Sequence, residues 1–428
     1  MNFLKDIGFS VIIKYIGMSL NIVTGIMIAR LLGPEGKGEI ALFLVNLVII
    51  SQLYNFGIPE FNILSYGKKI FKPEVILLVG LSYSILIFLG LSLVVTYLYI
   101  FSNYNLFEFA VLLLVGGLLE SIATHFRHLM LGFKKIKKYN FNVLIQTVSY
   151  LLALLFLYFS DILYINNVLI VLLLSRFIAI ITALNFVFKF ELKKVFEQKV
   201  AVLNYFKDIS KQCYKFFFMG LGATLNQRIV YFFLDNYYSN DKVGVYSVSE
   251  SFPGLINVAS SQISFILYPY ITNEKKSGKR LTIIALLLTL SIGTISLIIL
   301  SLIGQTIIDF IYGVAFSESY LSMLVIIAAL TFYSMNNSIT NFLISIGKVN
   351  TTARAVICSL VILFILLYFL INISFIFASL SVLFVNFIMF IYYMTLFVKN
   401  TKLCLRDFVD LKLSLSIAIN KKYNSINE

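Results

Sequence analysis

The sequence has 428 residues, of which 60% are hydrophobic and only 13% are charged. A soluble domain carries about 25% charged residues, and a water-soluble fold of this length needs a polar coat that so few charges cannot supply. The composition therefore excludes a soluble protein and predicts an all-α polytopic membrane protein. The formal net charge of +14 is expected from basic loops beside anionic lipid, so no nucleic-acid partner is expected.

Twelve apolar runs, separated by polar segments, have the length of a membrane-spanning helix, which needs about 20 residues. The second and eighth runs contain Pro59 and Pro253, and we expect each proline to bend its helix. The runs lie at residues 7–30, 40–66, 75–101, 106–131, 141–160, 164–188, 213–235, 243–271, 281–303, 319–346, 353–372 and 375–398.

The longest polar stretch, at 190–212, divides the twelve runs into six and six. Residues 201–211 within it place apolar side chains at near-helical spacing, which fits either a helix on the cytoplasmic membrane face or a plain linker. We expect four parts: an N-terminal six-helix bundle at 1–189, a cytoplasmic linker at 190–212, a C-terminal six-helix bundle at 213–398 and a cytoplasmic tail at 399–428.

Lysine and arginine gather on one side of the predicted spans. With the N terminus in the cytoplasm, 28 of the 34 basic residues fall in cytoplasmic segments, and only Arg30, Lys37 and Lys242 fall in outer loops. This bias predicts that both termini are cytoplasmic. The outer loops are short, whereas an enzyme that acts on glycans at the outer face usually needs a long one, so an enzyme is not expected.

The two halves resemble each other in pattern, although not in residue identity. Gly36-Lys37 follows the first span and Asp241-Lys242 follows the seventh, 205 residues apart. Both halves have six spans and begin on the same side, so a duplication would relate them by an axis along the membrane normal. Transporters with such repeats bind substrate between the halves and expose it to each side in turn.

Three segments resemble one known family. Residues 28–42, IARLLGPEGKGEIAL, resemble the end of the first span of polysaccharide flippases, and Gly57-Ile58-Pro59 resembles a later part of their second span. Residues 234–251, LDNYYSNDKVGVYSVSES, are similar to the start of their eighth span. The chain therefore resembles the Wzx-type oligosaccharide-lipid translocases of the multidrug/oligosaccharidyl-lipid/polysaccharide exporter superfamily. The peptidoglycan-precursor branch typically carries extra cations in span one and two further spans at the C terminus. Here span one has Lys14 and Arg30, and only polar-to-mixed residues follow span twelve in this sequence, so that branch is not expected.

This resemblance implies two bundles that form a V around a central cavity in a bacterial plasma (inner) membrane. The implied function is movement of an undecaprenyl-pyrophosphate-linked oligosaccharide, such as an O-antigen, lipopolysaccharide or capsule repeat unit, to the outer leaflet by alternating access or antiport. The implied partners are the lipid-linked oligosaccharide, membrane lipid and other polysaccharide-assembly proteins. No cofactor is implied beyond a proton or sodium gradient.

Two other functions remain open. A cation-coupled multidrug exporter of the same superfamily would share the fold, and it would need buried acids more than buried arginines. A membrane glycosyltransferase or glycan polymerase belongs to another class, and it would need catalytic acids at the membrane surface.

Two arginines inside predicted spans are the main substrate-binding candidates. A charge in the membrane interior is costly unless it faces a cavity or a partner. Arg228 and Arg176 could bind a pyrophosphate, because a guanidinium holds two oxygens at once. The alternatives are a pair between Arg228 and Asp235 and a pair between Arg176 and Glu120.

Two further cations lie in or beside the first span. Lys14 is about two turns into the span, where it either binds the headgroup or extends to the cytoplasmic interface. Arg30 ends the span, where it is either an interfacial anchor or a ligand for the substrate.

Three acids inside spans are candidates for ion coupling. Glu120 follows Gly116-Gly117, where a neighbouring helix can approach closely. Glu250 lies among serines, and Glu60 follows Pro59. Each of them carries a proton or sodium ion, or else serves as a neutral or paired structural acid.

Overall fold

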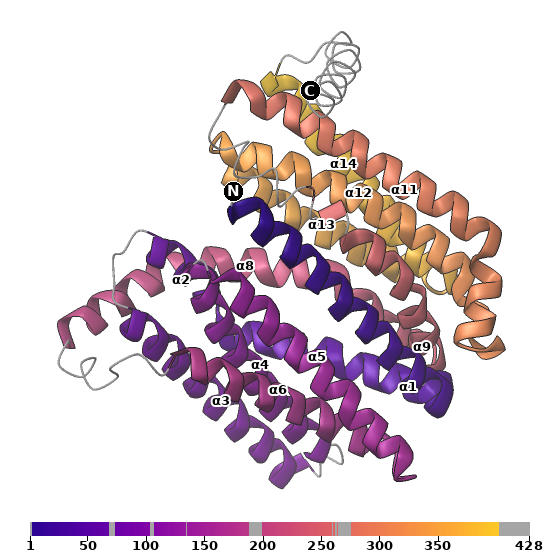
Figure 1. Ribbon diagram of the computed structural model, residues 1–428, viewed down its shortest axis with the longest axis horizontal. Coiled ribbons are helices and arrows are strands. Elements are labelled where there is room, and N and C mark those ends of the chain that lie inside the picture. Colours follow the sequence, from indigo (N-terminus) through magenta and orange to yellow (C-terminus); the bar gives the residue numbers. More distant parts are fainter. Residues whose placement is uncertain are drawn as a thin grey trace, which may run out of the picture. The chain divides into compact units, whose positions relative to one another are not determined.

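The structure is a computed structural model that describes residues 2–67, 73–102, 107–133, 135–187, 199–258, 260, 261, 263 and 275–401 (Figure 1). Every regular element in these residues is helical, which confirms the all-α fold class. The α-helices are α1 (Asn2–Asn55), α2 (Ile58–Gly67), α3 (Pro73–Ser102), α4 (Phe107–Gly132), α5 (Ile136–Phe159), α6 (Ile165–Val187), α8 (Lys199–Tyr237), α9 (Asn240–Ser249), α11 (Lys275–Ile311), α12 (Ser319–Ser345), α13 (Val349–Leu370) and α14 (Ile376–Thr401).

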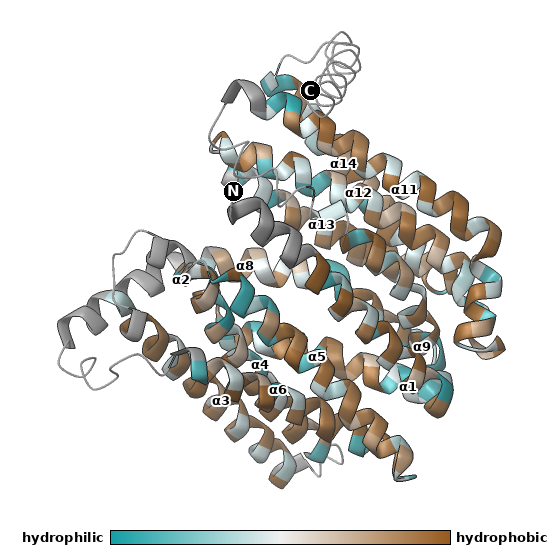
Figure 2. Ribbon diagram, in the orientation of Figure 1, coloured by the Kyte–Doolittle hydropathy of each residue, from teal (hydrophilic) through white to brown (hydrophobic). Residues whose placement is uncertain are grey.

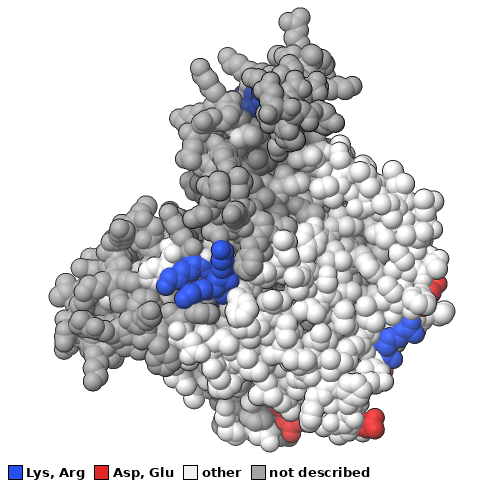
Figure 3. Space-filling model, viewed as in Figure 1, with Lys and Arg blue, Asp and Glu red and all other residues white. Residues whose placement is uncertain are grey.

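Within the described residues, nine helices are long and apolar enough to cross a membrane. They contain ten of the predicted spans, because α1 holds the first span and most of the second. The seventh span lies in α8, and the eighth begins in α9 and runs beyond the described residues. Most residues of the helices are apolar (Figure 2), and on the face shown in Figure 3 the charged side chains form small separate patches.

The chain forms two compact units. The first contains Met1–Ser247 with Ile311–Phe316, and the second contains Val248–Phe310 with Ser317–Glu428. Helix α8 belongs to the first unit, where it packs against α1 and α2. The bundle boundaries expected at 189, 212 and 398 stay predictions.

Helix α1 turns sharply at Gly33, whose φ of 68° and ψ of −172° interrupt the helix. Glycine adopts this left-handed backbone conformation without a steric penalty. Pro34 begins the second half of the helix, where its fixed φ fits and its missing N–H is not needed. The two halves of α1 consequently run on either side of this turn as a helical hairpin.

The bend expected at Pro59 is present in the turn that precedes it. The break between α1 and α2 is at Phe56 and Gly57, which have φ values of 45° and 71°. Pro59 lies in the first turn of α2, where a proline leaves the helix intact. Likewise, the helix that contains Pro253 is interrupted earlier, at Glu250. The preceding helices end at Asn55 and Ser249, each four residues before its proline. A proline removes the hydrogen bond to the carbonyl four residues earlier and its ring opposes that carbonyl, so both breaks lie where the prolines are expected to bend the chain.

Residues 201–211 are helical, as one of the two interpretations of the linker predicted. They form the beginning of α8 and continue directly into the seventh span, so they are not a separate helix. The Tyr205 hydroxyl hydrogen-bonds Asn62 of α2, and the Tyr205 ring stacks on Phe61 with centroids 6.0 Å apart. The start of α8 is therefore fixed to α2 within the first unit.

A reciprocal glycine contact joins the hairpin of α1 to the start of α9. A Cβ at Gly38 would lie 1.9 Å from the Asn240 carbonyl oxygen, and a Cβ at Gly244 would lie 2.0 Å from the Pro34 carbonyl oxygen. Pro34 and Asn240 are 206 residues apart, and so are Gly38 and Gly244. The contact therefore has approximate two-fold symmetry. Its repeat of 206 residues differs by one residue from the repeat of 205 that the sequence pattern predicted.

Two adjacent glycines bring α4 close to its neighbours. A Cβ at Gly116 would lie 2.6 Å from Leu173 of α6, and one at Gly117 would lie 2.6 Å from Ile50 of α1. This close approach, which the sequence predicted, positions Glu120 one turn further along α4.

The second unit is built on the packing of α12 against α14. Asn336 of α12 donates to the backbone oxygen of Asn386 at 3.0 Å, and the Phe342 and Phe397 rings meet edge to face at 4.9 Å. Gly293 of α11 packs on Thr331 of α12. Small residues thus bring helices together in this unit as well.

We expect Gly38→Ala to destabilise the protein by about 3 kcal/mol, because the added methyl meets a backbone oxygen that cannot rotate away. Thermal unfolding of the purified protein in detergent measures the effect. Gly90→Ala is the matched control, since a Cβ there meets nothing within 4 Å and alanine favours the helix by about 0.5–1 kcal/mol. Equal melting temperatures for the two variants would contradict the close contact.

Candidate functional site

A cavity of about 380 Å³ lies within the first unit. Its size falls in the range of about 300–1,000 Å³ that is usual for ligand pockets. Side chains from both halves of α1 and from α5, α6, α8 and α9 line it. The charged side chains among its described lining residues are Lys37, Arg176 and Arg228, and none of these lining residues is acidic.

Lys37 reaches the cavity because α1 turns back on itself. The lysine follows the Gly33 turn, and its Nζ lies 3.3 Å from the position that a Cβ of Gly25 would occupy on the opposite half of the hairpin. Glycine at position 25 therefore leaves room for the ammonium group. In the part of the chain that the structure describes, the Lys37 ammonium has no hydrogen-bond or ion-pair partner.

Arg228 lines the cavity from α8. Its guanidinium carbon lies 5.9 Å from the centre of the Tyr231 ring, one turn along the same helix, at the outer limit of a cation–π contact. Such a contact stabilises the charge of the guanidinium beside the cavity.

Arg176 of α6 lines the cavity and also forms an ion pair behind it. Its Nε lies 2.8 Å from Oε2 of Glu120, and its Nη1 donates to the Leu172 carbonyl oxygen at 3.1 Å. The Nε contact is an ion pair and not an aligned hydrogen bond, because this nitrogen has no hydrogen-bond partner. The predicted alternative of a pair between Arg176 and Glu120 is thus present, and the guanidinium still borders the cavity.

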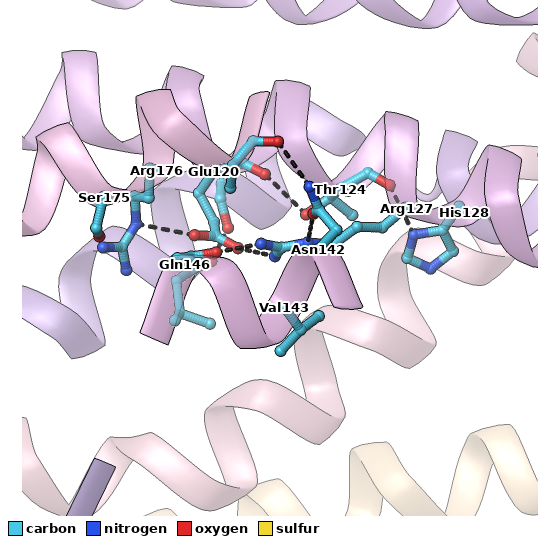
Figure 4. Close-up of polar contacts among 12 residues, drawn as sticks. Glu120, Thr124, Arg127, His128, Asn142, Val143, Gln146, Ser175 and Arg176 are labelled. Carbon is cyan, nitrogen blue, oxygen red and sulfur yellow. Dashed lines mark hydrogen bonds and ion pairs between the residues drawn. The ribbon is translucent and has the colours of Figure 1, made fainter. Parts of the chain in front are cut away.

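Glu120 is held by a second arginine on its own helix (Figure 4). Nη1 of Arg127 lies 3.3 Å from Oε1 of Glu120, and the rest of the guanidinium donates to Asn142 and Gln146 of α5. Asn142 in turn donates to the Ala179 carbonyl oxygen of α6 at 2.7 Å. One polar network therefore connects α4, α5 and α6 behind the cavity.

This arrangement gives the cavity a net positive charge. Two arginines share one carboxylate, so the network keeps a net positive charge that borders the cavity. With Lys37 and Arg228 added, the cavity attracts anions and repels cations. Its neutral polar lining can bind hydroxyl or amide groups and comprises Asn21, Thr24, Gln146, Thr147, Tyr150, Ser175, Tyr231 and Ser247.

The other two predicted cations lie apart from the described lining of this cavity. Lys14 is exposed on α1. Arg30 is also exposed, and its Nε donates to the Ile311 carbonyl oxygen at 2.9 Å. This contact fits the anchoring role that was the alternative for Arg30, and the roles of both residues in binding stay predictions.

The predicted acids also lie apart from one another. Oε1 of Glu60, on α2, is 3.9 Å from Nε2 of His128, whereas its other oxygen has no hydrogen-bond partner among the described residues. Glu250 lies at the interruption after α9, in the second unit. The structure thus brings only Glu120 of the three beside the cationic cavity.

The sequence did not predict that Lys37 and Arg127 belong to this site. Lys37 was assigned to an outer loop, and Arg127 was counted among the cytoplasmic residues. A signal for Lys37 exists in the sequence. Pro34 marks the first turn of a helix, so Lys37 shares a helical face with Ala41, Leu44 and Val48, all of which line the cavity. Arg127 also has a signal, because it follows Glu120 by seven residues, about two turns of the same helix, whereas its partners on α5 are shown only by the packing.

Solved structures share this fold over almost the whole chain. The lipid II flippase MurJ in an inward closed conformation matches with a TM-score of 0.73 at 16% identity, covering 97% of this chain and 92% of MurJ. An outward-facing multidrug resistance MATE family transporter of the MOP superfamily matches with a TM-score of 0.67 at 13% identity, covering 92% and 95%. A MOP superfamily transporter from Pyrococcus furiosus matches with a TM-score of 0.62 at 14% identity, covering 92% and 95%.

The apolar helices and the shared fold define a multi-pass membrane protein with a fold that is also found in flippases and transporters. The sequence matches the model of the polysaccharide biosynthesis protein family over residues 3–275, which is more than half of the chain. The chain therefore belongs to the polysaccharide biosynthesis protein family, in agreement with the resemblance found in its sequence. No curated protein matches the sequence.

We expect Glu120→Gln to lower the free energy of unfolding by about 3 kcal/mol, because it leaves two buried arginines without a counter-charge. Thermal or chemical unfolding in detergent measures this loss. The same substitution at Glu108, which is exposed near the start of α4, is the control and should change stability by less than about 0.5 kcal/mol. Similar losses in both variants would show that the network does not stabilise the fold.

Proposed function

We propose that this chain is a flippase for a lipid-linked oligosaccharide with an anionic headgroup. The substrate class is an undecaprenyl-pyrophosphate-linked repeat unit of a surface polysaccharide, such as O-antigen or capsule, moved from the cytoplasmic to the outer leaflet by alternating access. Membership of the polysaccharide biosynthesis protein family and the flippase-type fold support this proposal. The arrangement of two bundles in a V around the transport path is part of it.

The observation that carries the proposal is the charge of the cavity. Its described lining has Lys37, Arg176 and Arg228 and no acid. A pyrophosphate cannot cross hydrocarbon at a reasonable energetic cost unless other groups replace its hydration. Guanidinium and ammonium groups do so by donating charge-assisted hydrogen bonds to phosphoryl oxygens, while the lipid tail stays in the bilayer.

The same charges argue against the multidrug exporter of the same superfamily. A carrier of organic cations needs an acid or an aromatic surface to bind them, and a lining with three cationic side chains repels such substrates. The polar lining beside the cations also suits sugar hydroxyls. We therefore retain the flippase as the proposed function and place the protein in a bacterial plasma membrane, with both termini cytoplasmic as the distribution of lysine and arginine indicates.

A proton or sodium gradient is the proposed source of energy. Glu120 would have to leave two ion pairs before it could bind such an ion. Glu60 has one carboxylate oxygen with no hydrogen-bond partner among the described residues, so we propose it as the better coupling candidate. Other polysaccharide-assembly proteins are proposed to deliver the substrate and receive it.

We expect Lys37→Gln and Arg228→Gln each to slow translocation at least about ten-fold, because each removes one charged contact with the headgroup. The assay is transfer of undecaprenyl-pyrophosphate-linked oligosaccharide across proteoliposome membranes, with surface glycan in a flippase-null strain as a second readout. Lys242→Gln is the matched control, because Lys242 has the corresponding place in the second half and is absent from the described cavity lining.

Wild-type rates in both test variants, with normal insertion into the membrane, would disprove the role of the cavity in headgroup transfer. Export of an organic cation by the wild-type protein, without transfer of the oligosaccharide, would instead establish the multidrug exporter.

A further inference from the structure

Tyr150 of α5 has a hydroxyl group that the fold does not use. The side chain lines the cavity, and its buried Oη has no hydrogen-bond partner among the described residues. Burial of a hydroxyl without a partner is unfavourable, and folded proteins seldom leave one in this condition. Phenylalanine would fill the same space without this penalty. The tyrosine is therefore suited to a partner that enters the cavity.

The surroundings of this hydroxyl indicate the chemistry of that partner. Tyr150 lies one turn along α5 from Gln146 and Thr147, which also line the cavity. Arg176, on the neighbouring α6, lines the same cavity and brings a positive charge to it. Arg176 uses Nη1 for Leu172 and turns Nε toward Glu120, so these two contacts do not occupy its Nη2.

Both groups can donate to the same oxygen atom. A phenol donates one O–H, and the Nη2 of an arginine donates two N–H groups that carry positive charge. Two donors that line one cavity beside a net positive charge favour an acceptor that is negatively charged. A neutral sugar hydroxyl would use the phenol but would gain less from the guanidinium.

We infer that Tyr150 and Arg176 form a subsite for an oxyanion of the transported headgroup, in which the Tyr150 hydroxyl donates one hydrogen bond and Arg176 supplies the charge. The oxyanion is either a phosphoryl oxygen of the pyrophosphate or the carboxylate of an acidic sugar next to it. This inference rests on the proposed function, and it adds a specificity-determining residue from α5 to the cations already described.

The test uses the full-length protein in detergent, with inorganic pyrophosphate and glucuronate as separate probes. Calorimetric titration gives the Kd of each probe for the wild type, for Tyr150→Phe and for Tyr158→Phe. Tyr158 is the matched control, because it lies on the same helix, is exposed and does not belong to the described cavity lining. Melting temperatures without ligand are measured for all three proteins.

We expect Tyr150→Phe to melt at or above the wild-type temperature, because it removes an unpartnered buried hydroxyl. It should bind one probe about ten-fold more weakly, the loss expected for one hydrogen bond to a charged acceptor. A loss for pyrophosphate identifies the phosphoryl oxygen, and a loss for glucuronate identifies the acidic sugar. Tyr158→Phe should match the wild type in both measurements.

Unchanged binding of both probes by Tyr150→Phe would overturn this inference alone and leave the proposed function standing. A lower melting temperature for Tyr150→Phe would also overturn it, since the hydroxyl would then have a structural partner. If the wild type binds neither probe, the inference and the anionic headgroup of the proposed function fall together.

Discussion

A charge inside the hydrocarbon layer must have a counter-charge or face a polar cavity, and this constraint organises the first unit. Arg176 meets it in both ways, because Glu120 lies 2.8 Å from its Nε while the guanidinium borders the cavity. Arg127 gives the same carboxylate a second partner and connects it to α5. The buried network therefore holds α4, α5 and α6 together and at the same time supplies positive charge to the space where a ligand can bind.

Glycines give this arrangement its geometry. The turn at Gly33 sends α1 back along itself, so that Lys37 extends over Gly25 into the cavity. The reciprocal contact of Gly38 and Gly244 fixes the same hairpin against α9 with approximate two-fold symmetry. Such contacts leave no room for a β-carbon, so the glycines set the distance between backbones, and the cations take their positions from them.

Much of this fold can be read from the sequence, because an apolar run of about 20 residues has few alternatives to a membrane helix. The pairing of Arg176 with Glu120 could also be anticipated, since both are charges within spans. The break before Pro59 could be anticipated from the proline, whereas the left-handed backbone of Phe56 within it could not. Tyr150 is one of 26 tyrosines, and only packing shows that its hydroxyl is buried without a partner.

The central claim is that the cavity cations hold an anionic headgroup. An experimental structure of the protein saturated with an undecaprenyl-pyrophosphate-linked oligosaccharide tests it most directly. The account predicts pyrophosphate oxygens within hydrogen-bonding distance of Lys37 and of Arg228 or Arg176. A headgroup bound elsewhere, with these three side chains free of it, would contradict the account.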